Sequence, residues 1–188
     1  MGERGFHEGF AHNPNPKLII EKLGENFKID TASLKKWSVG SPIQSMMDAI
    51  EYLLKNNKFD HKDITELVVD IPSDRYHIVN DREILSISAQ HLIAVHLIKK
   101  KMGYVEAHDE KLFDDPEVVS LRKKIKAVSS DELAIARPER QSKIRIKLNN
   151  NKELFYHAKS VRGTPDNPMD EKDIVAKSKR LLEVFKTS

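Results

Sequence analysis

Two short alternating segments around residue 150 constrain the fold of this chain more than any other feature. Ile144, Ile146 and Leu148 alternate with charged residues, the letters NNNK follow, and the segment ELFYHAKSV runs back. A period of two is typical of a strand with one buried face, and a short polar connection between two such strands is typical of a hairpin. The buried face of an antiparallel hairpin needs a covering layer, which the rest of the chain must supply.

Two helical segments are the predicted source of that layer. The first begins at GSPIQ, where Ser41 is the expected N-cap, Pro42 the first helical residue and Gln44 the partner that closes a capping box. Apolar residues then recur at helical spacing as far as about Asn56. The second segment, residues 86–101, is apolar nearly all round, which indicates a buried helix.

The remaining segments decide the fold class. Strands are predicted at ITELVVDIP (64–72), near IKAVSS (125–130) and, as a short element, at SLKKWSV (33–39), and a last helix begins at NPMDEKD (167–173). Helices and strands therefore mix without strict alternation. We predict an α+β fold with two layers, in which a mostly antiparallel sheet is covered by helices on one face and a C-terminal helix follows.

Length and composition exclude several classes of protein. The 188 residues are enough for one well-cored domain. The net charge is +3 with both signs interspersed, so we expect no nucleic-acid partner. The chain has no cysteine, which excludes disulfides and thiolate catalysis and fits a cytoplasmic location. No segment has the apolar length of a membrane span, so we expect no membrane association.

The histidine spacing argues against a metal site. His91 and His96 are five residues apart, which is about 140° around a helix, so the two rings cannot bind one ion together. No metal is expected. A histidine in a buried helix is either hydrogen-bonded within the core or open to a cavity, and the sequence leaves both alternatives open for His91.

A pair of lysines directly before the first predicted helix suggests anion binding. Lys35 and Lys36 on an extended stretch point to opposite faces, so at least one of them can turn toward the helix start at Ser41. The free N–H groups of a helix N-terminus favour a carboxylate. The alternative is a solvated lysine pair that protects an edge strand from aggregation. Spacing alone does not choose between them.

Four segments, in this order and at similar separations, resemble the C-terminal half of the MmgE/PrpD family: KKWSVGSPIQSMMDAI, DREILSISAQHLIAVHLI, DPEVVSLRKKIKAV and VRGTPDNPMDEKDIVAKSKRLL. The resemblance implies a connecting segment (1–32), an α+β lid domain (33–165) and a C-terminal helix (166–188) that packs on a helical catalytic domain. We therefore expect the chain to be incomplete without a helical domain or subunit, and the assembly to be a homodimer.

The family includes 2-methylcitrate dehydratase, cis-aconitate decarboxylase and iminodisuccinate epimerase. The resemblance thus implies a lyase or isomerase that acts on a small di- or tricarboxylate without a cofactor. Such chemistry needs cations for the carboxylates and an acid/base pair near the reacting carbon. A hypothesis from another class is a non-catalytic interaction or small-acid-binding module.

The resemblance also implies roles for individual residues. The lysine that the family places before its first lid helix falls on Lys35, which is thereby a catalytic candidate. The position of a family tyrosine falls on Leu92, so the neighbouring His91 is the candidate for a polar catalytic group in its place. The candidates for substrate binding are Lys36, Ser41 and Arg162.

Overall fold

The computed structural model describes residues 6–10, 12–15 and 17–186, and the chain divides into two compact units, residues 1–32 and 33–188. In the first unit the described residues form two short helices, α1 (Phe6–Phe10) and α2 (Lys17–Ile20), and a 3₁₀ turn. None of the described side chains of this unit is buried. The core of the protein therefore belongs to the second unit.

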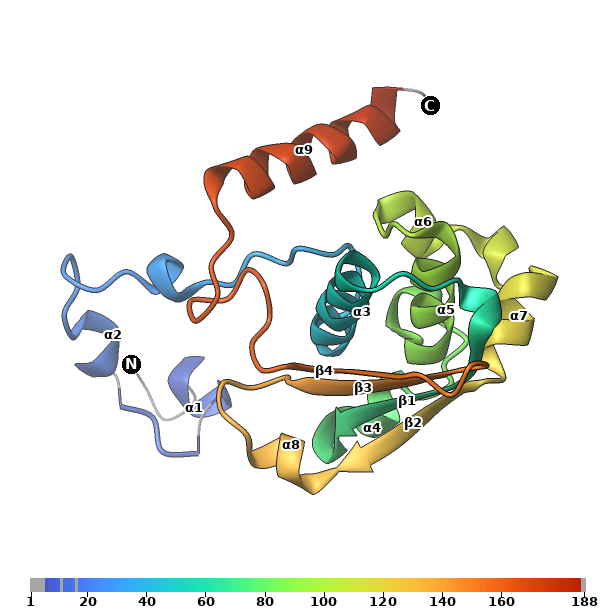
Figure 1. Cartoon of the computed structure of the whole chain (residues 1–188). Coiled ribbons are helices and arrows are strands. Elements are labelled where there is room, and N and C mark those ends of the chain that lie inside the picture. Colours follow the sequence, from blue (N-terminus) through green and yellow to red (C-terminus); the bar gives the residue numbers. More distant parts are fainter. Residues whose placement is uncertain (1–5, 11, 16, 187–188) are drawn as a thin grey trace. The chain divides into compact units, whose positions relative to one another are not determined.

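Four strands of the second unit form one mixed sheet in the order β2-β1-β3-β4 (Figure 1). β1 (Ile64–Pro72) pairs antiparallel with β3 (Ser142–Leu148), and β3 pairs antiparallel with β4 (Glu153–Ala158). β2 (Ile125–Ser130) runs parallel to β1, because the chain between them makes a long helical crossover. The predicted hairpin and the α+β class are confirmed. The sheet is mostly antiparallel, and its edge strand β2 runs parallel to its neighbour β1.

Helices α3 (Gln44–Asn56) and α5 (Ala89–Lys99) lie side by side on one face of this sheet (Figure 1). Residues 89–97 of α5 are all buried, in agreement with the apolar pattern of the sequence. The other helices are α4 (Ser73–Val79), α6 (Tyr104–His108), α7 (Pro116–Arg122), α8 (Asp131–Ile135) and the C-terminal α9 (Glu171–Lys186).

The hydrophobic core lies between the sheet and these two helices. On β3, Ile144 and Ile146 point into the core and are almost completely buried. Arg145 lies between them on the opposite face, where its guanidinium forms two hydrogen bonds of 2.7 and 2.8 Å with the buried carboxylate of Asp70. The alternation that predicted the hairpin is thus the alternation between core and outer face.

The start of α3 differs from the predicted capping box. Residues Ser41–Ile43 form a 3₁₀ turn, the α-helix begins at Gln44, and neither element has a side-chain cap. The buried Gln44 side chain instead accepts a hydrogen bond from the backbone N–H of Trp37 (3.0 Å). It also donates to the carbonyl oxygens of Trp37 (2.9 Å) and Val39 (3.1 Å). The capping prediction was wrong because these buried backbone groups lack a strand partner and take the glutamine amide.

The predicted strand at residues 33–39 is also absent. This segment is extended and bent without pairing to the sheet. Trp37 and Val39 are buried in the core, and the N–H of Leu34 donates to the carbonyl of Gly163 (2.7 Å). The apolar spacing of the segment therefore reflects side chains that anchor it to the core. Its backbone is held by hydrogen bonds to the Gln44 side chain and to the loop that contains Gly163.

Replacing Gln44 by methionine, which has a similar length, is expected to lower the free energy of unfolding by about 2 kcal/mol, because buried backbone groups lose their partners. Ser41→Ala is the matched control and is expected to cost less than about 0.5 kcal/mol, since Ser41 caps no helix. Urea denaturation of both variants measures the difference. Equal urea midpoints for the two variants would show that the Gln44 amide does not hold the backbone of residues 37–39.

Candidate functional site

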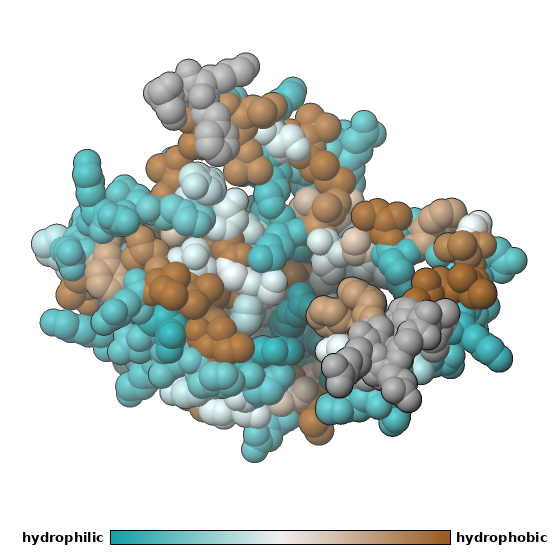
Figure 2. All heavy atoms as spheres, turned by 180° about the vertical axis from the view of Figure 1, so that it is seen from behind, coloured by the Kyte–Doolittle hydropathy of each residue, from teal (hydrophilic) through white to brown (hydrophobic). Residues whose placement is uncertain are grey.

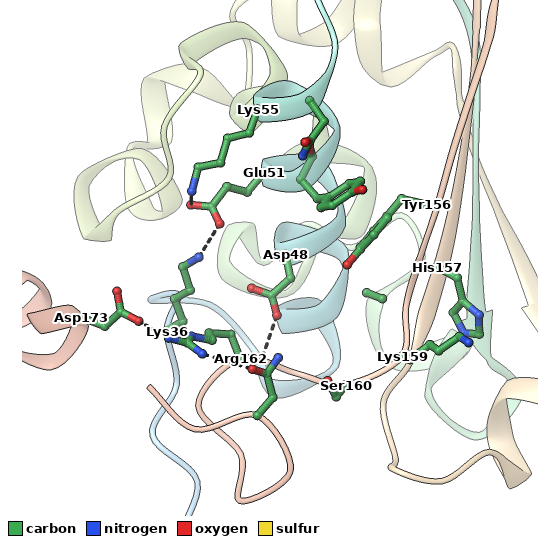
Figure 3. A pocket seen from close by; sticks show the side chains of 14 residues that line it. Lys36, Asp48, Glu51, Lys55, Tyr156, His157, Lys159, Ser160, Arg162 and Asp173 are labelled. Atoms are coloured by element: carbon green, nitrogen blue, oxygen red, sulfur yellow. Dashed lines mark hydrogen bonds and ion pairs between the residues drawn. The ribbon is translucent and has the colours of Figure 1, made fainter. Parts of the chain in front are cut away.

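A polar cleft of about 530 Å³ opens between α3 and the edge strand β4 (Figure 3). Its charged and polar side chains come from segments far apart in the sequence and include Lys36 before α3, Asp48, Glu51 and Lys55 on α3, Tyr156 and His157 on β4, Lys159 and Arg162 after β4, and Asp173 on α9. Cations from three segments thus share one cleft with carboxyl groups and a phenol.

Asp48 ties the walls of the cleft together. One carboxyl oxygen accepts a hydrogen bond from the indole N–H of Trp37 (2.8 Å) and the other accepts one from the backbone N–H of Arg162 (2.9 Å). Burial raises the pKa of Asp48, and these hydrogen bonds and the charge of Lys36 offset this effect only in part. Asp48 therefore holds a proton more strongly than an exposed aspartate and fixes both flanking segments to α3.

Arg162 is oriented by contacts on both sides. Its guanidinium donates to the carboxylate of Asp173 (2.7 Å) and to the side-chain oxygen of Asn167 (3.2 Å). The hydrogen bond from Arg162 lowers the pKa of Asp173. The next residue, Gly163, has φ +96°, and a Cβ there would collide with the carbonyl of Leu34. Only glycine allows this turn, which sets the direction of the arginine.

Lys36 is held by a carboxylate and an aromatic ring. Its ammonium lies 2.5 Å from Glu51 and 4.5 Å from the centre of the Trp37 ring. Lys55 contacts the other oxygen of Glu51 at 3.1 Å. Burial raises the pKa of Glu51, but the hydrogen bonds from Lys36 and Lys55 outweigh burial, and the pKa is lowered. Glu51 is therefore ionised at neutral pH and keeps Lys36 at the cleft.

Tyr156 brings a hydroxyl to the same cleft. Its ring stacks on Tyr52 with 3.7 Å between the ring centres, and its side chain points toward Asp48 (Figure 3). Burial, and then the neighbouring Tyr52 and Asp48, raise the pKa of Tyr156. The hydroxyl is thus protonated at neutral pH and can donate a hydrogen bond. Asp48 and Tyr156 together offer a carboxyl group and a phenol for proton transfer.

The structure places the sequence-predicted residues in different parts of the second unit. Lys36 and Arg162 line the cleft, whereas Lys35, Ser41 and His91 do not. Lys35 is exposed, and its carbonyl oxygen accepts a hydrogen bond from Lys177. Ser41 is half-buried in the 3₁₀ turn.

His91 lies in the core. It is fully buried, and its ring is centred 5.6 Å from the ring of Phe113. Neither ring nitrogen has a hydrogen-bond partner within the described part of the chain. Burial, with a smaller contribution from Arg122, lowers the pKa of His91 to about 4. The imidazole is therefore neutral at neutral pH.

Sequence reasoning missed Asp48 and Tyr156. A signal for Asp48 was available, because it is the one charged residue in the segment 46–50 of α3, whose other residues are apolar. Tyr156 was hidden in the hairpin, where it pairs with Ile144 on the inward face. The contact of Asp48 with Arg162 joins residues far apart in the sequence, so no local pattern indicates it.

Among the described residues, no group of three or more histidine, aspartate or glutamate side chains is arranged to hold a metal ion. None of the described helices is both long and apolar enough to cross a membrane.

Comparison with models of known protein families identifies the domain. The family model of the MmgE/PrpD C-terminal domain matches residues 37–188. The search of curated proteins found no match. The matched region contains the sheet, its helical layer and every residue that lines the cleft except Lys36, which lies one position before it.

Proposed function

Because this chain belongs to the MmgE/PrpD family and carries its C-terminal domain, we propose that it is the lid half of a cofactor-independent lyase or isomerase that acts on a small di- or tricarboxylate. The observation that carries the proposal is the composition of the cleft. Lys36, Lys159 and Arg162 surround the carboxyl group of Asp48 and the hydroxyl of Tyr156. Cations of this kind bind substrate carboxylates, and the carboxyl group of Asp48 and the phenol of Tyr156 serve proton transfer.

Arg162 and Lys36 are the proposed carboxylate ligands. Arg162 already contacts the carboxylate of Asp173, and Lys36 contacts that of Glu51. Both side chains are therefore positioned to bind a carboxylate. A substrate carboxylate would share or replace these internal partners. The planar guanidinium suits a carboxylate especially well, because it donates two parallel hydrogen bonds.

Asp48 and Tyr156 are the proposed acid/base groups. Removal of a proton next to a carboxylate needs a base whose pKa is raised toward neutrality, and burial raises the pKa of Asp48. The negative charge that develops on the substrate would be stabilised by Lys36 and Arg162. The protonated Tyr156 would then donate to a leaving hydroxyl group or to the resulting enolate.

A helical domain, on the same polypeptide or on a separate subunit, is proposed to complete the site, with a homodimer as the assembly. Support comes from α9, where Ile174, Val175 and Leu182 are exposed. Figure 2 shows hydrophobic side chains along this helix at the top of the view. Exposed apolar groups in a row are typical of a surface that another domain covers.

The test combines the chain with a helical domain of its family and follows di- and tricarboxylates in D₂O by proton NMR. Loss of substrate, or exchange of the proton next to a carboxylate for deuterium, is the expected result. Binding of a polycarboxylate without either change would favour the alternative, a small-acid-binding module. If no polycarboxylate binds, the chain is neither the proposed lyase or isomerase nor the alternative small-acid-binding module.

A further inference from the structure

A second cleft, of about 560 Å³, shares only Glu51 and Lys55 with the first. Aromatic and apolar side chains contribute to its lining: Trp37, Leu54, Phe59 and Met102. Trp37 and Met102 are almost completely buried, so their positions are set by the core. A cleft of this size, lined by apolar side chains on one part and by charged groups on another, can hold a small molecule with both kinds of surface.

The charged residues of this cleft are mostly cations. Its cationic side chains are Lys55, Lys58, Lys100, Lys101 and Arg180, and its one acid is Glu51. Lys55, Lys100 and Lys101 each have an acidic partner, at 3.1, 4.0 and 2.7 Å respectively. They also lie near the C-terminal ends of α3 and α5, where cations complement the helix dipole.

Lys58 and Arg180, the other two cations of this cleft, have no such acidic partner within 4.0 Å among the residues that the structure describes. They come from separate elements, Lys58 from the segment after α3 and Arg180 from α9. Their two positive charges are therefore available to an anion in the cleft.

His96 supplies an independent observation. It lines this cleft, is almost completely buried, and lies with its ring centre 5.2 Å from that of Trp37. Its Nδ1 atom has no hydrogen-bond partner in the described structure. A buried polar group without a partner is costly, and such groups are frequent where a ligand belongs.

We propose that this second cleft binds a small dianion with a flat aromatic body. Lys58 and Arg180 match the two charges, and the half-buried side chains of Leu54 and Phe59 offer an apolar surface for the aromatic part. This ligand differs in kind from the aliphatic polycarboxylate proposed for the first cleft. It is an accessory ligand of the domain, and its binding does not depend on the proposed reaction.

The test uses Trp37, the single tryptophan of the chain, as a fluorescent reporter. Phenyl phosphate is titrated into the full chain at pH 8, where its phosphate carries two charges. Saturable quenching is expected. Inorganic phosphate, which lacks the ring, is expected to bind about threefold to tenfold more weakly. Absence of saturable quenching, or equal binding of inorganic phosphate, would overturn the proposal.

Variants separate this site from the first cleft. The double variant Lys58→Gln/Arg180→Gln is expected to bind phenyl phosphate about tenfold more weakly. The control Lys179→Gln removes the same charge beside Arg180 but outside both clefts, and Arg162→Gln alters only the first cleft. Both controls are expected to bind as the parent chain does. A comparable loss in either control would mean that the anion binds elsewhere.

Discussion

Acidification from pH 7 to pH 5 is expected to lower the free energy of unfolding by about 4 kcal/mol through His91 and His96 alone. Both rings are buried, and burial lowers the pKa of each to about 4 from an ordinary value of 6.5. One pKa unit corresponds to about 1.4 kcal/mol, which gives about 2 kcal/mol for each ring over this pH interval.

The direction follows from proton binding. As the pH falls, the unfolded chain takes up protons on these histidines near pH 6.5, whereas the folded chain takes them up only near pH 4. Between these values the unfolded state holds more protons, so stability decreases as the pH falls. Below pH 4 the difference stops growing. Urea denaturation at pH 7, 6 and 5 measures the slope.

Two variants and one control assign the slope to these rings. His91→Leu and His96→Leu are each expected to reduce the loss between pH 7 and pH 5 by about 2 kcal/mol, whatever their effect on stability at pH 7. The control is His77→Leu, which removes an exposed histidine. A pH dependence that both core variants retain in full would contradict the proposed origin.

The sheet was predictable where periodicity and neighbouring sequence decide the structure. The β3–β4 hairpin forms because its strands adjoin along the chain and alternate between core and outer face. The parallel pairing of β2 was not predictable, since it depends on where a long crossover returns the chain. The segment 33–39 has strand-like spacing but lies outside the sheet, because Gln44 satisfies part of its backbone.

The candidate site was predictable only in part, because contacts between residues far apart in the sequence decide which side chains line it. Local sequence showed that Lys35 or Lys36 could face a site and left a solvated lysine pair as the alternative. The position of Lys36 at the cleft depends on Glu51 and the Trp37 ring, which hold its side chain. The position of Arg162 depends on its contact with Asp48 across the fold. The catalytic roles of Lys35 and His91 stay predictions from the family pattern.

Removal of either proposed carboxylate ligand of the first cleft, Lys36 or Arg162, is expected to lower kcat/KM of the reconstituted enzyme about 100-fold. A charge-assisted hydrogen bond to a carboxylate contributes up to about 3 kcal/mol, which corresponds to that factor. The variants are Lys36→Gln and Arg162→Gln. Arg162→Lys keeps the charge without the planar pair of donors, so it is expected to recover only part of the activity. Steady-state kinetics on the best polycarboxylate measures each effect.

Lys35→Gln is the decisive comparison, because Lys35 and Lys36 are neighbours that differ in their relation to the cleft. The cleft geometry predicts the larger loss for Lys36→Gln, and the family pattern predicts it for Lys35→Gln. Urea denaturation of each variant separates an effect on activity from an effect on folding. A large loss confined to Lys35→Gln would move the reacting carboxylate to the exposed side of the segment, where a helical domain would have to supply the acid/base groups proposed for Asp48 and Tyr156.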